Sequence, residues 1–112
     1  MHRAPAPFSA TETRHGDTVV IAVAGELDIA TAPRLESAVP PLRPGDTLVI
    51  DLRETAFMDS SGLHVLMRLD VAGREQGWSL AVVRGGPDVQ HIMDVVRLAD
   101  RIRLVDSPED AS

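Results

Sequence analysis

The sequence predicts a single α/β domain with a mixed, mostly parallel sheet of four to five strands packed by helices. Its 112 residues match the size of one domain with one core. Three apolar runs, at residues 18–24, 47–52 and 78–83, are typical of buried strands. Segments with helical periodicity separate these runs, and right-handed crossovers would make the three strands parallel.

The start of the chain predicts a tail followed by a β-hairpin. Residues 1–7 contain two prolines and no periodic pattern, so we expect a flexible N-terminal tail there. Residues 8–13 form a short predicted strand, and the β-branched run at 18–24 forms a second one. Turn-forming residues at 15–17 separate the two strands, which favours antiparallel pairing between them.

A short helix is predicted after the hairpin. Residues 25–28 are expected to end the second strand. Thr31 then offers a helix cap, and Pro33 falls in the first helical turn, where its missing N–H costs little. This helix should end before Pro40, because proline cannot continue a helix.

The second half of the chain alternates strands and helices. The strand at 47–52 is followed by a polar segment and then by a predicted helix at 61–75. That helix is apolar around most of its circumference, so it should pack against a sheet. Later elements are a helix end at Gly77, a strand at 78–83, a loop at 84–88, a helix to about 96 and a strand near 102–105. We place the domain at 8–106 and a short C-terminal tail at 107–112.

Composition excludes several classes of function. Eleven cationic side chains, all of them Arg, stand against seventeen Asp and Glu, which gives a net charge of −6. A chain of this charge repels phosphate backbones, so we expect no direct nucleic-acid binding. It has no cysteine, which leaves no disulfide and favours a reducing compartment. No apolar run approaches the roughly 18 residues of a membrane span, so we expect a cytoplasmic protein with no membrane association.

Polar side chains gather where two predicted strands end. Loops at 25–31 and 57–62 should meet at the carboxyl edge of the sheet, which is the usual functional edge of parallel sheets. Together they carry Asp28, Asp59, Ser60 and Ser61. Ser and Asp before a helix are most often N-caps, and Asp59 or Ser60 could fill that role.

Ser61 is the residue of this group that is free of capping duty. It should lie in the first turn of the helix with its hydroxyl outward, and Gly62 beside it would let another protein approach the backbone. A phosphoryl group on Ser61 would sit at the positive end of the helix dipole, so the fold should tolerate it. It would add about −1.5 to −2 charge next to Asp59, and this charge would disfavour burial in a partner interface.

Two motifs together resemble a known family. Gly25-Glu26-Leu27-Asp28-Ile29-Ala30-Thr31-Ala32 and Asp59-Ser60-Ser61-Gly62-Leu63, on this order of elements, are similar to the STAS domain of bacterial anti-sigma factor antagonists. The resemblance covers nearly the whole chain and implies a single STAS-like domain. It also implies that the second serine of the Asp-Ser-Ser-Gly motif, here Ser61, is phosphorylated by a partner that is both anti-sigma factor and serine kinase of the GHKL type.

The resemblance implies a partner-switching cycle that regulates transcription. The unphosphorylated protein would bind the kinase and release a sigma factor, and a serine phosphatase would later remove the phosphate. ATP would be used by the kinase, so we expect no cofactor in this chain, which should be a monomer when free. Residues expected at the partner surface are Asp28, Thr31, Met58, Asp59, Ser60, Gly62, Leu63 and His64. His64 replaces a glycine found in many relatives, and the family's C-terminal helix is expected to be short or absent here.

Two alternatives are weighed against this function. An esterase-like enzyme could use Ser61 and His64, but the Gly-x-Ser-x-Gly pattern is missing, so we predict no enzyme. The four histidines lack metal-ligand spacing, which predicts no metal site. A constitutive STAS adaptor, such as a small subunit of an ABC-type lipid transport complex or a signalling scaffold, would use Ser61 only as a contact residue.

Overall fold

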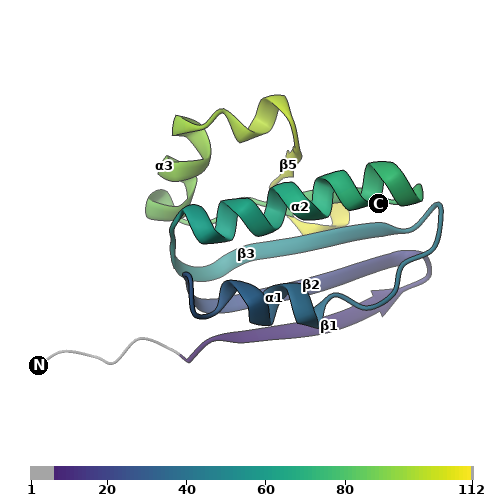
Figure 1. Ribbon diagram of the computed structural model, residues 1–112, viewed down its shortest axis with the longest axis horizontal. Coiled ribbons are helices and arrows are strands. Elements are labelled where there is room, and N and C mark those ends of the chain that lie inside the picture. Colours follow the sequence, from purple (N-terminus) through teal and green to yellow (C-terminus); the bar gives the residue numbers. More distant parts are fainter. Residues whose placement is uncertain (1–6, 112) are drawn as a thin grey trace, which may run out of the picture.

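The protein folds around one five-stranded sheet, seen in a computed structural model that describes residues 7–111 (Figure 1). The strands lie in the order β1-β2-β3-β4-β5. β1 and β2 are antiparallel, and every later neighbour is parallel. The predicted mixed, mostly parallel sheet is thereby confirmed. The strands are β1 Ser9–His15, β2 Thr18–Leu27, β3 Thr47–Met58, β4 Ser79–Val83 and β5 Arg103–Val105.

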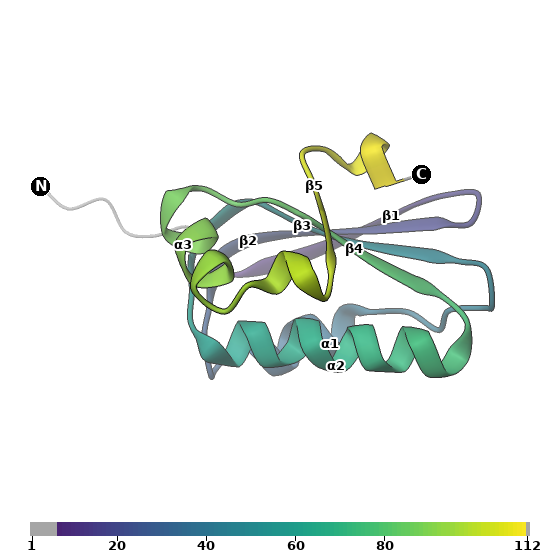
Figure 2. The ribbon, with the colours of Figure 1, turned by 90° about the horizontal axis from the view of Figure 1, so that it is seen from above.

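Three α-helices cover one face of this sheet. Figure 2 shows α1 and α2 beneath the sheet and the C-terminal segment on its other side. Buried side chains of α2 and α3 belong to one core with the strands. The helices are α1 Ala32–Ala38, α2 Ser60–Gln76 and α3 Pro87–Val95, with short 3-10 helices η1 Leu98–Asp100 and η2 Pro108–Ala111.

The C-terminal residues are part of the folded domain. Residues 107–111 were expected to form a tail, but η2 packs on the sheet face opposite the helices, where Ala111 is buried beside Val49 and Val105. Arg103 fixes this segment by donating to the carbonyls of Asp110 and Ala111, at 2.6 and 3.2 Å. The tail prediction is therefore wrong for these residues. The predicted N-terminal tail lies outside the described residues except for its last one.

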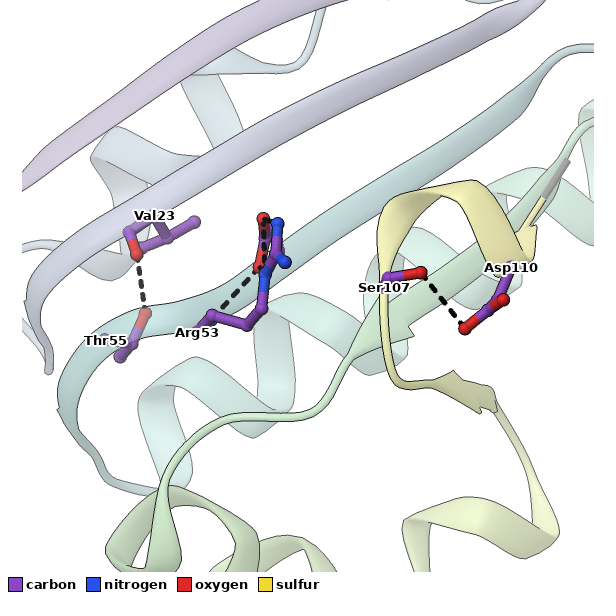
Figure 3. Close-up of polar contacts among 6 residues, drawn as sticks. Val23, Arg53, Thr55, Ser107 and Asp110 are labelled. Atoms are coloured by element: carbon purple, nitrogen blue, oxygen red, sulfur yellow. Dashed lines mark hydrogen bonds and ion pairs between the residues drawn. The ribbon is translucent and has the colours of Figure 1, made fainter.

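β2 and β3 run further than predicted. Gly25 was expected to end β2, yet its φ of 88° lies next to a register shift within the strand, and pairing continues to Leu27. The buried Thr55 hydroxyl donates to the carbonyl of Val23, at 2.9 Å, and joins the two strands across this irregular stretch (Figure 3). On β3, Arg53 forms a two-pronged ion pair with Asp51. These extensions carry both strands to the sheet edge where the two loops begin.

α2 is the longest helix and is packed on one side only. It ends at Gly77, as predicted, with a φ of 88°. The predicted packing of this helix against the sheet is confirmed, since Leu66 is fully buried in the core with the strands. Met67 and Val71 lie on the outer side of the helix and are 36% and 41% exposed.

α1 and α2 are joined by an ion pair. Arg68 donates through Nε and Nη2 to the two carboxylate oxygens of Glu36, at 3.0 and 2.8 Å. The hydrogen bond from Arg68 holds the pKa of Glu36 below its usual value of 4.5. Both side chains are largely exposed, so solvent screens the pair.

This ion pair predicts an acid-sensitive contribution to stability. Because the folded-state pKa of Glu36 is lowered, the stabilisation is complete above pH 4.5 and is lost as the pH falls through the folded-state value. We expect Glu36→Gln to lower the free energy of unfolding slightly at neutral pH, and we expect this deficit to be smaller near about pH 3. Urea denaturation at both pH values measures this difference.

Glu75→Gln is the matched control, since Glu75 lies exposed on α2 and forms no ion pair with any of residues 7–111. A deficit of Glu36→Gln that is equally large at both pH values would contradict the ion-pair interpretation.

Candidate functional site

The two predicted loops meet at the carboxyl edge of the sheet. In Figure 1 this is the end where β2 leads into α1 and β3 leads into α2. The backbone N–H of Asp59 donates to the carbonyl of Leu27, at 3.2 Å, and so connects the end of one strand to the start of the other loop. Asp28 and Ser61 are thereby placed in one loop cluster, as the sequence indicates.

Asp28 and Thr31 hold the first loop in shape. The Asp28 carboxylate accepts from the backbone N–H groups of Ala30 and Thr31, at 3.0 and 3.1 Å. The Thr31 hydroxyl donates back to the carbonyl of Glu26, at 2.7 Å. Thr31 does occupy the cap position of α1, but its side chain makes no cap hydrogen bond. The polar atoms of both side chains thus satisfy the backbone of their own loop.

Asp59 is the N-cap of α2. Its carboxylate accepts from the backbone N–H of Ser61, at 2.8 Å, which satisfies one of the free N–H groups at the helix start. Ser60 is exposed and Ser61 is half-buried in the first turn. The Ser61 hydroxyl makes no hydrogen bond to any of residues 7–111, so it is available for chemistry or contact.

Gly62 is needed for packing inside the domain. A Cβ at this position would come within 2.6 Å of Cγ of Met58 and within 2.9 Å of the Leu27 side chain. The interpretation that Gly62 opens the backbone to another protein is therefore corrected, because Gly62 is itself buried. Met58 and Leu63 are only 3% and 5% exposed. These three predicted contact residues are buried and support the loop from within the core.

A hollow of about 190 Å³ lies beside Ser61, between α1 and α2. His64, an exposed and predicted contact residue, contributes to its wall together with Arg68 and Ile29. Sequence reasoning missed Arg68 and Ile29. Arg68 follows Ser61 by about two helical turns, which places both on one face of α2. Ile29 is an apolar side chain in a polar loop, and it is 80% exposed.

The arrangement of Ser61 and His64 bears on the enzyme alternative. Ser61 and His64 line the same hollow, but within residues 7–111 no hydrogen bond joins their side chains. The Asp59 carboxylate engages the backbone of Ser61 and does not orient an imidazole. Among the described residues, no three His, Asp or Glu side chains could hold a metal ion. None of the described helices is long and apolar enough to cross a membrane.

Fold and site together define a small α/β domain that presents one rigid polar loop cluster, with an accessible serine, at the edge of its sheet. The chain belongs to the STAS domain family, since the family model described as "Mlab, STAS domain" matches residues 10–106.

Named relatives agree with this family. The chain is 32% identical over 93 residues to the anti-sigma-B factor antagonist of Listeria monocytogenes, covering 81% of this chain and 82% of that protein. It is 33% identical over 87 residues to the one of Bacillus subtilis, covering 77% and 80%. An anti-sigma factor antagonist structure from Mycobacterium paratuberculosis matches with a TM-score of 0.76 and 30% identity, over 96% of this chain and 95% of that one. The fold also matches unphosphorylated SpoIIAA, with a TM-score of 0.68, 20% identity and coverage of 93% and 92%.

The tight packing at Gly62 predicts that replacing this glycine by alanine destabilises the protein, which is the opposite of the usual effect in a helix. Ala is favoured over Gly by about 1 kcal/mol in an open helix. We expect Gly62→Ala instead to destabilise the protein by about 1–3 kcal/mol, because the added methyl group overpacks the contact with Met58. Urea denaturation followed by circular dichroism measures the change.

Ser60→Ala serves as the control, because Ser60 is the exposed neighbour at the start of the same helix. It should stay within about 0.5 kcal/mol of wild type. A Gly62→Ala variant as stable as wild type would disprove the packing role.

Proposed function

We propose that this protein is an anti-sigma factor antagonist regulated by phosphorylation of Ser61. The unphosphorylated form binds an anti-sigma factor that is also a serine kinase, and this binding releases the sigma factor. The observation that carries the proposal is the free hydroxyl of Ser61, in the first turn of α2 and in a loop cluster whose two carboxylates and Thr31 hydroxyl are committed to the backbone. The similarity to named antagonists, at 32% and 33% identity, supports it.

The partner surface is formed by the exposed members of the cluster. Ile29 and Phe57 offer apolar area at 80% and 45% exposure, and Ser60 and His64 are exposed beside them. Apolar side chains at the centre of a small polar ring are typical of protein interfaces. Asp28, Thr31 and Asp59 act indirectly, since their hydrogen bonds fix the shape of the loops.

Phosphorylation ends binding through charge rather than unfolding. Ser61 Oγ attacks the γ-phosphorus of ATP held by the kinase; the bond to ADP breaks, and the hydroxyl proton passes to a base of the kinase. The added charge of about −1.5 to −2 must then be desolvated in the interface. A penalty of about 3–4 kcal/mol would weaken binding by roughly two to three orders of magnitude.

The other partners follow from this cycle. A serine phosphatase regenerates the unphosphorylated form, and the chain itself needs no cofactor because the kinase supplies ATP. The free protein is a cytoplasmic monomer that exposes the loop cluster to its partner.

A constitutive adaptor is the second candidate. The matching family model, described as "Mlab, STAS domain", is not restricted in its name to sigma-factor regulation. In this role the same surface binds a partner permanently, and Ser61 carries no phosphate. Phosphorylation by a kinase separates the two candidates.

The first test is phosphate transfer. We expect a GHKL-type serine kinase from the same organism to add one phosphate with ATP, and tandem mass spectrometry to place it on Ser61, because this hydroxyl is accessible and unpartnered. Ser61→Ala should take up none, whereas Ser60→Ala should still be phosphorylated. Absence of phosphate at Ser61 with every such kinase would favour the adaptor.

The second test is affinity for the kinase. Ser61→Ala should bind within about threefold of wild type, because it adds no charge, while Ser61→Asp should bind at least about tenfold more weakly. Isothermal titration calorimetry with the purified kinase measures both. Equal affinities of the two variants would count against a charge-based switch.

A further inference from the structure

The hollow beside Ser61 is lined by two side chains that can donate hydrogen bonds, although the chain carries a net charge of −6. Its wall contains the side chains of His64 and Arg68 and no carboxylate. The rest of the wall comes from the start of α1 and the loop before it: Ile29, Ala32 and Pro33. A volume of about 190 Å³ is ample for a phosphoryl group with its hydrogen-bond partners.

Helix geometry directs these two side chains toward Ser61. Residues 61, 64 and 68 are separated by three and four positions, so they lie on one stripe of α2. Side chains on an α-helix lean toward its N-terminus. The imidazole of His64 and the guanidinium of Arg68 therefore lean toward the turn that carries Ser61, and all three meet in the same hollow.

The Arg68 guanidinium is already oriented and has donors to spare. Glu36 accepts from Nε and Nη2, at 3.0 and 2.8 Å, and no other hydrogen bond to residues 7–111 involves Arg68. A guanidinium carries five N–H donors in a fixed plane. The Nη1 group is left for a further acceptor. Because the two bonds to Glu36 already restrict the Arg68 side chain, it loses less conformational entropy on binding an anion than an unpaired arginine would.

We propose that His64 and Arg68 form an internal binding site for the phosphoryl group of phosphorylated Ser61. The inference rests on the proposed function in so far as Ser61 becomes phosphorylated in the cell. Arg68 donates from Nη1 to the phosphoryl oxygens, His64 donates a ring N–H, and Glu36 positions Arg68 from α1. Charge-assisted hydrogen bonds of this kind are about twice as strong as neutral ones.

Internal binding has a consequence for the phosphorylated state. Asp59 is close to Ser61, since its carboxylate holds the Ser61 backbone N–H, and its charge repels a phosphoryl group. The Arg68 guanidinium and the His64 ring N–H offset that repulsion within the domain. The phosphorylated protein is thus a stable state, and the phosphoryl group lies against its own helix.

The test uses the full chain with phosphoserine inserted at position 61 during translation, so that no kinase is needed. Urea unfolding is compared for phosphorylated and unphosphorylated protein, each with and without Arg68→Gln. Loss of the Glu36 ion pair is common to both Arg68→Gln proteins and cancels in this cycle. We expect phosphorylation to favour the folded state about threefold to tenfold more with Arg68 than without it. His64→Gln should act in the same direction with a smaller effect.

Arg74→Gln is the matched control, because Arg74 lies on the same helix and also pairs with a carboxylate, that of Asp70 at 3.0 Å. It should show no coupling to the phosphate. A ³¹P NMR spectrum near pH 8, where the phosphoryl group is a dianion, should shift on Arg68→Gln and stay unchanged on Arg74→Gln.

The proposal is overturned by coupling of Arg68 to the phosphate below about twofold, or by a ³¹P resonance that Arg68→Gln leaves in place. A failure of the kinase to phosphorylate Ser61 would instead refute the proposed function. Because the phosphoserine is inserted in translation, that failure would leave this measurement unaffected.

Discussion

The close packing of Gly62 holds the start of α2 against the ends of β2 and β3. A side chain at Gly62 would overlap Met58 and Leu27, and the Asp59 N–H bonds directly to the Leu27 carbonyl. Protein interiors packed this closely are hardly compressible, so the position of one element determines that of its neighbour. The height and direction of Ser61 above the sheet edge therefore follow from core packing, and any partner meets this serine on a rigid support.

The polar side chains around that contact fall into two groups, those that hydrogen-bond to the backbone and those that are left unpartnered. Asp28, Thr31 and Asp59 use their oxygens to satisfy loop and helix N–H groups or carbonyls. This leaves the Ser61 hydroxyl unpartnered within the described residues, next to exposed His64 and Ile29. Pre-organised loops reduce the entropy lost on association, which suits the binding role proposed for this surface.

The sequence allowed the element order, the parallel strands and the meeting of the two loops to be predicted, because these follow from local periodicity and crossover rules. It did not reveal the lengths of β2 and β3. Glycine often marks the end of a strand, but β2 continues past Gly25 through a shift in its register with β3. The role of Gly62 was misread because the crowding comes from the side chains of Met58 and Leu27, and tertiary packing brings the end of β2 with Leu27 against the helix start. Arg68 was missed for a similar reason, as its partner Glu36 lies 32 residues away.

Local charge placement explains more about this site than the net charge does. The chain total of −6 and the two carboxylates Asp28 and Asp59 describe an acidic loop cluster, yet the hollow next to Ser61 is walled by His64 and Arg68. Ser61 thus has the Asp59 carboxylate beside its backbone N–H and the Arg68 guanidinium in the wall of the hollow that it lines. A hydroxyl and a phosphoryl group can both be accommodated by the same backbone. If phosphorylation changes affinity without changing the fold, the change must arise in the interface, where the added charge is desolvated against the partner's surface.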